Sequence, residues 1–125
     1  MELNDVTFKV RTAIFAVFKE LGPGLLESIY AGALEIELRT AGLMVETERP
    51  VRVYYKGDDL GLGFRFDLLV EDQVVVEVKS VESLHNVHKK QLISYLKISG
   101  KKIGILVNFN VDYLQDKISL VRLVN

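Results

Sequence analysis

The run VVVEVK at residues 74–79 constrains the fold of this chain more than any other feature. A nearly continuous stretch of β-branched residues is typical of a central strand that is covered on both faces. Side chains alternate along a strand, so Glu77 and Lys79 point to one face while Val76 and Val78 point to the other. A charge inside such a strand is costly unless it is paired or binds a metal. The run therefore predicts a functional site or, as the alternative, an exposed face on which both charges are solvated.

A further charge interrupts the apolar segment that precedes this strand. Asp67 lies within FRFDLLV at residues 64–70, and only residues 71–73 connect the two segments. A connection this short predicts an antiparallel hairpin, which brings Asp67 within reach of Glu77. Two facing carboxylates repel each other unless a cation lies between them. With Lys79 beside them, the pair indicates a site that handles a negatively charged group.

The hydrophobic periodicity of the chain predicts helices and strands in the order ααβββαββ. Pro50 indicates that the first strand either lies at a sheet edge or contains a bulge, and residues 56–59 predict a hairpin turn. Helices before and after a meander of strands are typical of an α/β protein of the α+β type, with a mixed sheet flanked by helices. No linker or repeat interrupts residues 1–125, so one domain is expected. The expected helices span about 5–21, 25–41 and 84–99, and the expected strands about 44–55, 60–70, 74–80, 102–109 and 118–123.

Composition excludes several kinds of site. The chain is 49% hydrophobic and 26% charged, which is typical of a globular protein. It has no cysteine and two histidines, which excludes thiolate zinc sites, cysteine nucleophiles and multi-histidine metal clusters. A metal site must then consist mainly of carboxylates, which favours Mg²⁺ or Mn²⁺. The sequence shows neither a signal peptide nor an apolar span long enough to cross a bilayer, so we expect a cytoplasmic protein with no membrane partner.

Positive charge is concentrated in one part of the chain. The formal net charge is −1, yet residues 79–102 carry six lysines and one acid, a net charge of +5 over 24 residues. Such an asymmetry produces a local positive surface. Lys90 and Lys97 share one stripe of the helix predicted there, and Lys101 lies just beyond its end. A solvated helix face is the ordinary interpretation of this stripe, and contact with a nucleic-acid backbone is the functional hypothesis.

Several motifs resemble those of a known nuclease superfamily. The charged residues of the hairpin, an Asp followed after nine residues by E-x-K, resemble the signature of the PD-(D/E)XK nuclease superfamily. GLLESIY at residues 24–30 matches the signature that names the GxxExxY protein family. HKKQLISY at residues 88–95 resembles the H-x-x-Q and Q-x-x-x-Y elements of that family and of exonuclease-like members of the superfamily, and IGILVNF at residues 103–109 resembles the strand that follows. The resemblance runs from about residue 5 to residue 125 and implies a restriction-endonuclease-like core.

The resemblance implies a role for each matching residue. Asp67 and Glu77 would bind a divalent ion. Lys79 would position or activate the attacking water and stabilise the charged phosphate. Glu27 would be an additional acidic residue near the metal, and Gln91 would orient a ligand or a phosphate at the site.

One face of the third predicted helix carries further candidates. His88, Gln91 and Tyr95 fall at i, i+3 and i+7, which places them on one side of the helix. The resemblance implies that Tyr95 backs Gln91, and we predict that His88, Lys90 and Lys97 join Tyr95 in binding the substrate. The structural alternatives are a packing histidine and a core tyrosine with a satisfied hydroxyl.

Two residues of the GLLESIY motif also have structural interpretations. Glu27 falls in the first turn of a predicted helix, where an acid complements the helix dipole. Tyr30 lies on the same helix face as Glu27. For Tyr30 the sequence favours a core role with a satisfied hydroxyl.

Two functions are compatible with these features. The first is a nuclease, a phosphodiesterase dependent on Mg²⁺ or Mn²⁺, in which Asp67 and Glu77 bind the ion and Lys79 assists water attack. Its expected partner is nucleic acid, with DNA favoured. The alternative is a non-catalytic nucleic-acid-binding or assembly module that keeps the nuclease fold. In that case the edge strand at 44–55 could be covered by a second subunit of a homo-oligomer.

Overall fold

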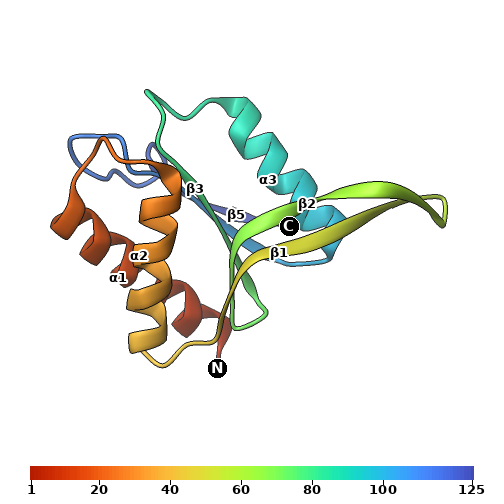
Figure 1. Ribbon diagram of the computed structural model, residues 1–125, viewed down its shortest axis with the longest axis horizontal. Helices are drawn as coiled ribbons and strands as arrows, with labels where there is room; N and C mark the ends of the chain where they lie inside the picture. Colours follow the sequence, from red (N-terminus) through yellow and green to blue (C-terminus); the bar gives the residue numbers. More distant parts are fainter.

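The computed structural model describes residues 1–125 and places three helices around a five-stranded sheet (Figure 1). Helices and strands follow one another in the order ααβββαββ. This confirms the predicted α+β class with a mixed sheet flanked by helices, consistent with a restriction-endonuclease-like core. The elements are α1 (Leu3–Leu21), α2 (Glu27–Thr40), β1 (Val45–Tyr55), β2 (Asp58–Val70), β3 (Val74–Lys79), α3 (Asn86–Ser99), β4 (Ile103–Asn108) and β5 (Leu120–Val124).

The strands lie side by side in the order β1-β2-β3-β4-β5, with β3 at the centre as its valine run predicts. All neighbouring pairs are antiparallel except β3 and β4, which are parallel. Parallel neighbours need a crossover connection, and α3 supplies it. β1 is an edge strand, as predicted from Pro50, which has no N–H to donate to a further strand.

β3 separates two apolar cores because its side chains alternate between the faces of the sheet. Val76 and Val78 belong to a core of 20 buried residues on the side of α1 and α2, and Val75 belongs to a core of seven on the side of α3. Glu77 therefore points to the α3 side. Only 7% of Glu77 is exposed, so the alternative of a solvated face is wrong for this residue. Lys79 is half-buried on the same face.

The helices agree with the predicted ranges to within two residues at each end. α3 begins at Asn86, and His85 is its N-cap residue. The backbone N–H of His85 donates a hydrogen bond to Nδ1 of His88 in the first turn (3.0 Å). Gly100 ends α3 in the left-handed conformation (φ 76°), as the sequence predicts. None of the helices is both long and apolar enough to cross a membrane.

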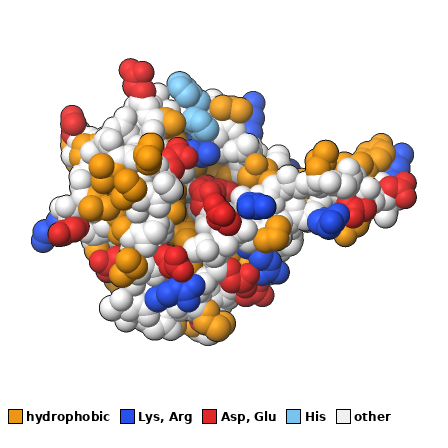
Figure 2. Space-filling model, viewed as in Figure 1, with side chains coloured by type: hydrophobic (Ala, Val, Ile, Leu, Met, Phe, Trp, Pro, Cys, Tyr) orange, Lys and Arg blue, Asp and Glu red, His pale blue; other side chains and the backbone are white.

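β1 and β2 continue beyond the rest of the sheet as a two-stranded projection (residues 49–65, called the arm below; Figures 1 and 2). β2 pairs with β3 only over residues 68–70, so the strands of the arm pair only with each other. At the tip, Lys56 (φ 50°) and Gly57 (φ 88°) are both left-handed, as a type I′ turn requires. The predicted hairpin turn is confirmed, but it is shorter than residues 56–59, because β2 already begins at Asp58.

Gly63 allows the two strands of the arm to approach closely. A Cβ atom at Gly63 would lie 1.9 Å from the carbonyl oxygen of Val51. The register between the strands shifts next to this contact, between Arg52 and Tyr54. The local geometry of the arm therefore requires a residue without a side chain.

Candidate active site

The pairing of β2 with β3 stops where the two predicted carboxylates would face each other. The last ladder pair is Leu68 with Val76, and the next would be Asp67 with Glu77. Instead, the Asp67 carboxylate accepts a hydrogen bond from the backbone N–H of Val78 (2.8 Å), and the Glu77 carboxylate accepts one from the backbone N–H of Asp67 (3.3 Å). The predicted proximity of Asp67 and Glu77 is confirmed, and their side chains fill the gap that opens between the strands.

Glu77 lies in surroundings that disfavour its charged form. Burial raises the pKa of Glu77 to about 9, and the Asp67 carboxylate adds to the increase, both by hydrogen bonding to the protonated Glu77 side chain and by charge repulsion. The hydrogen bond from the backbone N–H of Asp67 favours the charged form and lowers the pKa. The positive charge of Lys79 also lowers the pKa of Glu77. At neutral pH Glu77 therefore keeps its proton unless a cation comes close to the pair.

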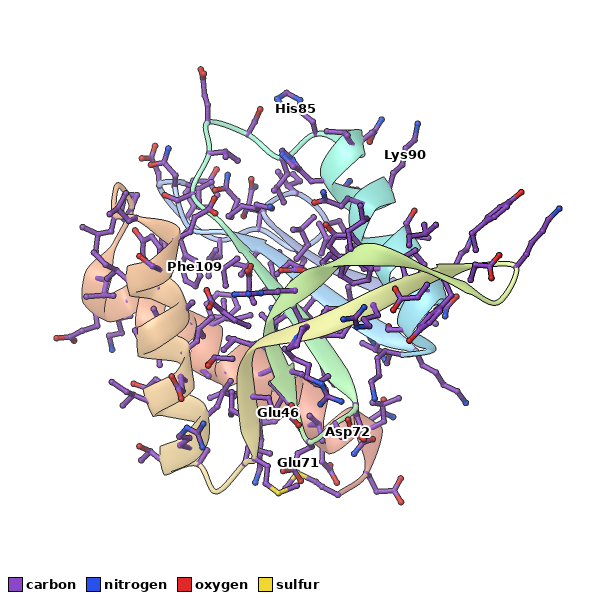
Figure 3. All side chains as sticks on the ribbon, turned by 45° about the vertical axis from the view of Figure 1, so that its right-hand side comes forward. Glu46, Glu71, Asp72, His85, Lys90 and Phe109 are labelled. Atoms are coloured by element: carbon purple, nitrogen blue, oxygen red, sulfur yellow. The ribbon has the colours of Figure 1, made fainter.

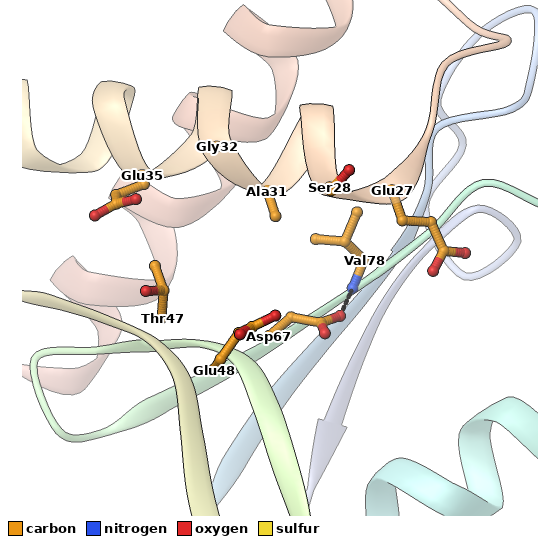
Figure 4. A pocket seen from close by; sticks show the side chains of 9 residues that line it. All are labelled: Glu27, Ser28, Ala31, Gly32, Glu35, Thr47, Glu48, Asp67 and Val78. Atoms are coloured by element: carbon orange, nitrogen blue, oxygen red, sulfur yellow. Dashed lines mark hydrogen bonds between the residues drawn. The ribbon is translucent and has the colours of Figure 1, made fainter.

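A cleft of ≈ 320 Å³ opens between α2 and the foot of the arm (Figure 4). Its wall contains four carboxylates and no basic side chain. Acidic side chains also gather beside the foot of the arm in the surface view (Figure 2). Asp67 links this cleft to the gap between β2 and β3, because its hydrogen bond to Val78 lies at the cleft wall (Figure 4). The lining residues are Glu27, Ser28, Ala31, Gly32, Glu35, Thr47, Glu48, Asp67 and Val78.

The loop before α2 joins the cleft to the end of β3. The carboxylate of Glu27 accepts a hydrogen bond from the backbone N–H of Ser80 (2.9 Å), and the Ser80 hydroxyl donates to the carbonyl oxygen of Leu25 (2.7 Å). Tyr30 holds the loop, because its hydroxyl donates to the carbonyl oxygen of Gly22 (2.5 Å) and accepts from the N–H of Leu25 (3.2 Å). Tyr30 is fully buried. It thus has the core role that the sequence favours, and it presents Glu27 next to β3.

Tyr95 approaches the carboxylate pair from the α3 side of the sheet. Its ring stacks on Phe64, with centroids 3.7 Å apart and planes 4° apart. Burial raises the pKa of Tyr95, and the negative charges of Glu77 and Asp67 raise it further.

The remaining predicted residues of α3 stand apart from the acidic cleft. Gln91, Lys90 and Lys97 are all exposed on the helix surface, and Figure 3 shows Lys90 projecting away from the helix. None of them lines the cleft. His88 is half-buried, and its Nδ1 already accepts the hydrogen bond from His85 that starts α3. The part of these four side chains in substrate binding stays a prediction.

Asn108 is a buried polar residue that the sequence analysis did not single out. It lies beside Lys79 in the parallel register of β3 and β4 and is 1% exposed. Its side chain accepts a hydrogen bond from the backbone N–H of Val81 (3.0 Å) and donates one to the carbonyl oxygen of Val81 (2.9 Å). Asn108 thereby fixes the segment that follows Lys79. A polar residue at the end of the apolar run IGILVN was the available signal.

Two acids of the cleft were also missed. Glu35 lies eight residues after Glu27, so both fall on one face of α2, and this spacing was a usable signal. Glu48 lies opposite Asp67, between the ladder pairs of residues 47 and 49. Its backbone is left-handed (φ 49°), which is uncommon for a glutamate and has no counterpart in the local sequence.

The carboxylate oxygens of Asp67 and Glu77 are the type of ligand that a hard divalent ion prefers. Mg²⁺ and Mn²⁺ prefer oxygen ligands, and Mg²⁺ is commonly held by one or two carboxylates together with waters. A buried carboxyl with a raised pKa also gains from a nearby cation, because the cation favours its charged form. The structure gathers no group of three acids, histidines or cysteines that could hold a metal. Glu27 bonds to Ser80 in this arrangement, and its role as a third ligand stays a prediction.

Comparison with protein families places the chain in a known superfamily. The family model described as the PD-(D/E)XK nuclease superfamily matches residues 4–121. The matched range includes the carboxylate pair, Lys79, the start of α2 and the whole of α3. Neither the curated proteins nor the solved structures gave a match.

Proposed function

The chain belongs to the PD-(D/E)XK nuclease superfamily, and from this premise we propose that it hydrolyses phosphodiester bonds in nucleic acid with the help of a divalent ion. The observation that carries the proposal is the separation of β2 from β3 at Asp67 and Glu77, which leaves two carboxylates and Lys79 at one point of the sheet. We propose DNA as the substrate and Mg²⁺ or Mn²⁺ as the cofactor. The motif at residues 24–30 supports the narrower assignment to the GxxExxY family.

Asp67 and Glu77 are the residues that would hold the ion. When bound, a divalent ion supplies positive charge for the phosphate and makes a water molecule more acidic. The backbone bonds from Val78 to Asp67 and from Asp67 to Glu77 orient the two carboxylates. Glu77 is protonated at neutral pH when no cation is present, so loading of the site releases a proton from this residue.

Lys79 acts on the substrate from the same face of β3 as Glu77. Its ammonium group stabilises the negative charge that develops on the phosphate and positions the attacking water. Glu27 adds negative charge at the cleft wall beside the end of β3. Gln91 orients the phosphate and Tyr95 supports it from α3, while His88, Lys90 and Lys97 contact the nucleic acid farther along that helix.

A cleavage assay with a matched pair of lysine variants tests this proposal. The purified protein is incubated with single-stranded DNA, double-stranded DNA and RNA, each with Mn²⁺, Mg²⁺ or EDTA. We expect cleavage only with a divalent ion, and a rate about 100-fold lower for Lys79→Ala, a typical effect of removing one electrostatic group from an active site. Lys102→Ala is the control and should cut normally, because Lys102 is exposed and lies at the opposite end of the β3–β4 pair.

Two results would contradict the catalytic proposal. One is the absence of cleavage by the wild-type protein with every substrate and ion. The other is a Lys79→Ala variant that cuts at the wild-type rate. Nucleic-acid binding without any cleavage would instead identify the non-catalytic binding module that keeps the fold.

A further inference from the structure

The arm exposes aromatic and basic side chains along its outer strand. Tyr54 and Tyr55 on β1 are 58% and 62% exposed. Residues 49–57 contain three cations and no acid, while the whole chain has a net charge of −1. The ammonium group of Lys56 lies 5.4 Å from the ring centroid of Tyr55. A stretch of this composition, at the free edge of the sheet, is a surface with affinity for both aromatic rings and phosphates.

The cations of the arm can change partners at small cost. Arg52 pairs with Asp59 (2.6 Å), and the two side chains are 64% and 40% exposed. Exposed pairs of this kind contribute little to stability because water screens them. A phosphate can therefore replace Asp59 as the partner of Arg52. Lys56, at the turn, pairs with no carboxylate and is available without any exchange.

The molecule exposes somewhat more surface than its mass predicts. A monomeric protein of 14.1 kDa is expected to expose about 6,700 Å², whereas this chain exposes 7487 Å². A two-stranded hairpin is also marginally stable without a further layer to pack on, so contact with a ligand would stabilise the arm.

The foot of the arm is the candidate active site. Glu48 and Asp67 lie opposite each other at the point where the arm joins the sheet. At the foot, Phe64 of β2 stacks on Tyr95 of α3, next to the carboxylate pair. A polymer that lies along β1 from the tip toward Arg49 therefore reaches the acidic cleft directly.

We propose that the arm binds single-stranded nucleic acid and leads it to the Asp67 and Glu77 site, an inference that rests on the proposed nuclease function. Tyr54 and Tyr55 are neighbours on β1 and point to opposite faces of the arm. Unpaired bases stack on a tyrosine on each side of the free edge, and Arg52 and Lys56 contact the adjacent phosphates. A duplex cannot use the two tyrosines in this way, because its base faces are already covered by neighbouring base pairs. The arm therefore selects single strands over duplexes.

A binding measurement separates this inference from the catalytic proposal. Fluorescence anisotropy is measured in EDTA, where no cleavage occurs, with labelled oligo(dT), oligo(rU) and a DNA duplex of the same length. We expect the wild-type protein to bind the single strands more tightly than the duplex. Tyr54→Ala/Tyr55→Ala should weaken single-strand binding by about 30-fold, since loss of one stacked base costs about fivefold or more. Tyr113→Ala, at a 64% exposed tyrosine outside the arm, is the matched control and should bind normally.

Three outcomes would overturn the inference. The arm does not bind single strands if the double variant keeps wild-type affinity, or if the duplex binds as tightly as the single strands. Light scattering tests whether the arm instead forms a contact between two copies of the chain. A wild-type dimer that becomes monomeric in the double variant, with nucleic-acid binding unchanged, would identify the arm as a contact between two copies of the chain. If the wild-type protein cleaves nucleic acid but the double variant binds single strands as well as the wild-type protein does, the inference about the arm is refuted and the catalytic proposal stands. If binding depends on the arm but the wild-type protein cleaves nothing, the catalytic proposal is refuted and the inference stands.

Discussion

Asp67 and Glu77 exchange hydrogen bonds with each other's strand where β2 and β3 separate. The Glu77 carboxylate accepts the N–H of Asp67 (3.3 Å), and the Asp67 carboxylate accepts the N–H of Val78 (2.8 Å). In a continuous antiparallel ladder, backbone carbonyl oxygens fill this role. Only one oxygen of each carboxylate accepts a hydrogen bond from the backbone, which leaves the other oxygen available to a cation. The separation of the two strands therefore also creates the oxygen ligands of the proposed cation site.

Replacement of Asp67 should separate cation binding from folding. Asp67→Asn keeps an oxygen for the Val78 N–H but removes the negative charge, so we expect a folded protein that no longer binds Mn²⁺. Calorimetric titration with Mn²⁺ measures binding, and circular dichroism monitors the fold. Asp112→Asn changes an exposed acid between β4 and β5 and should leave binding intact. Equal Mn²⁺ affinity of Asp67→Asn and the wild-type protein would contradict a cation site at Asp67.

The raised pKa of Glu77 predicts that stability depends on pH when no divalent ion is present. The pKa of Glu77 is about 9 in the folded protein and 4.5 as the ordinary value. A carboxyl whose pKa is raised by folding contributes stability below its unfolded pKa, and this contribution is lost as the pH rises toward the folded pKa. The free energy of unfolding in EDTA should therefore fall by a few kcal/mol, as an order of magnitude, between about pH 5 and pH 9.

Urea denaturation at several pH values measures this loss, with Glu77→Gln as the comparison. The amide introduced by this substitution cannot ionise, so the variant should show a flatter profile over the same range. Mn²⁺ should restore part of the stability of the wild-type protein at high pH, because a ligand that binds only the folded state stabilises it. Identical pH profiles of the two proteins would show that Glu77 does not titrate as proposed.

Removal of the Asn108 side chain should destabilise the end of β3. Asn108→Ala breaks two hydrogen bonds to Val81 and leaves partly buried backbone groups without partners, at a cost of about 1 kcal/mol for each group, the lower end of the range for unsatisfied groups. Hydrogen exchange should show faster exchange at Val81. Asn110→Ala is the control, because only the backbone N–H of Asn110 is used, as a donor to Asn108. A stability loss that is the same for both variants would argue against a special role for Asn108.

Two glycine substitutions should change stability in opposite directions. In Gly63→Ala the new methyl group meets the carbonyl oxygen of Val51, so the arm must distort and the protein should lose stability. Gly32 lies in the interior of α2 with open space around its Cα, and Gly32→Ala should stabilise the helix by roughly 0.5–1 kcal/mol. Thermal unfolding of the two variants measures both effects. A Gly63→Ala variant as stable as the wild-type protein would show that the strands of the arm are not held in close contact.

Local sequence signals were sufficient for the order of elements and for the main contact of the site. The short connection at residues 71–73 and the valine run of β3 predict that Asp67 and Glu77 meet, and the structure confirms it. Both signals act over a few residues: a tight turn sets the register of a hairpin, and alternation sets the face of each side chain. Gly100 and Pro50 are interpreted correctly for the same reason, since each acts on its own backbone.

The features that local signals could not reveal depend on contacts between distant elements. The ladder between β2 and β3 ends at Leu68, although FRFDLLV continues as a strand pattern without interruption. Before Leu68, β2 pairs only with β1. No residue of β2 predicts this change of partner. Glu48 adopts a left-handed conformation opposite this opening, a geometry that glycine or asparagine would have signalled and glutamate does not.

Because the arm forms no backbone pairs with the rest of the sheet, its length can change in evolution without changing the sheet. Its strands pair only with each other and are joined by the two-residue turn Lys56-Gly57. Insertion or deletion of two residues in each strand beside that turn changes the reach of the arm and preserves which face every other side chain occupies. The register at Leu68 and Val76 stays unchanged throughout. Arm length can therefore vary between homologues, or be altered by an engineer who attaches a probe at the tip, without disturbing the hairpin that carries Asp67 and Glu77.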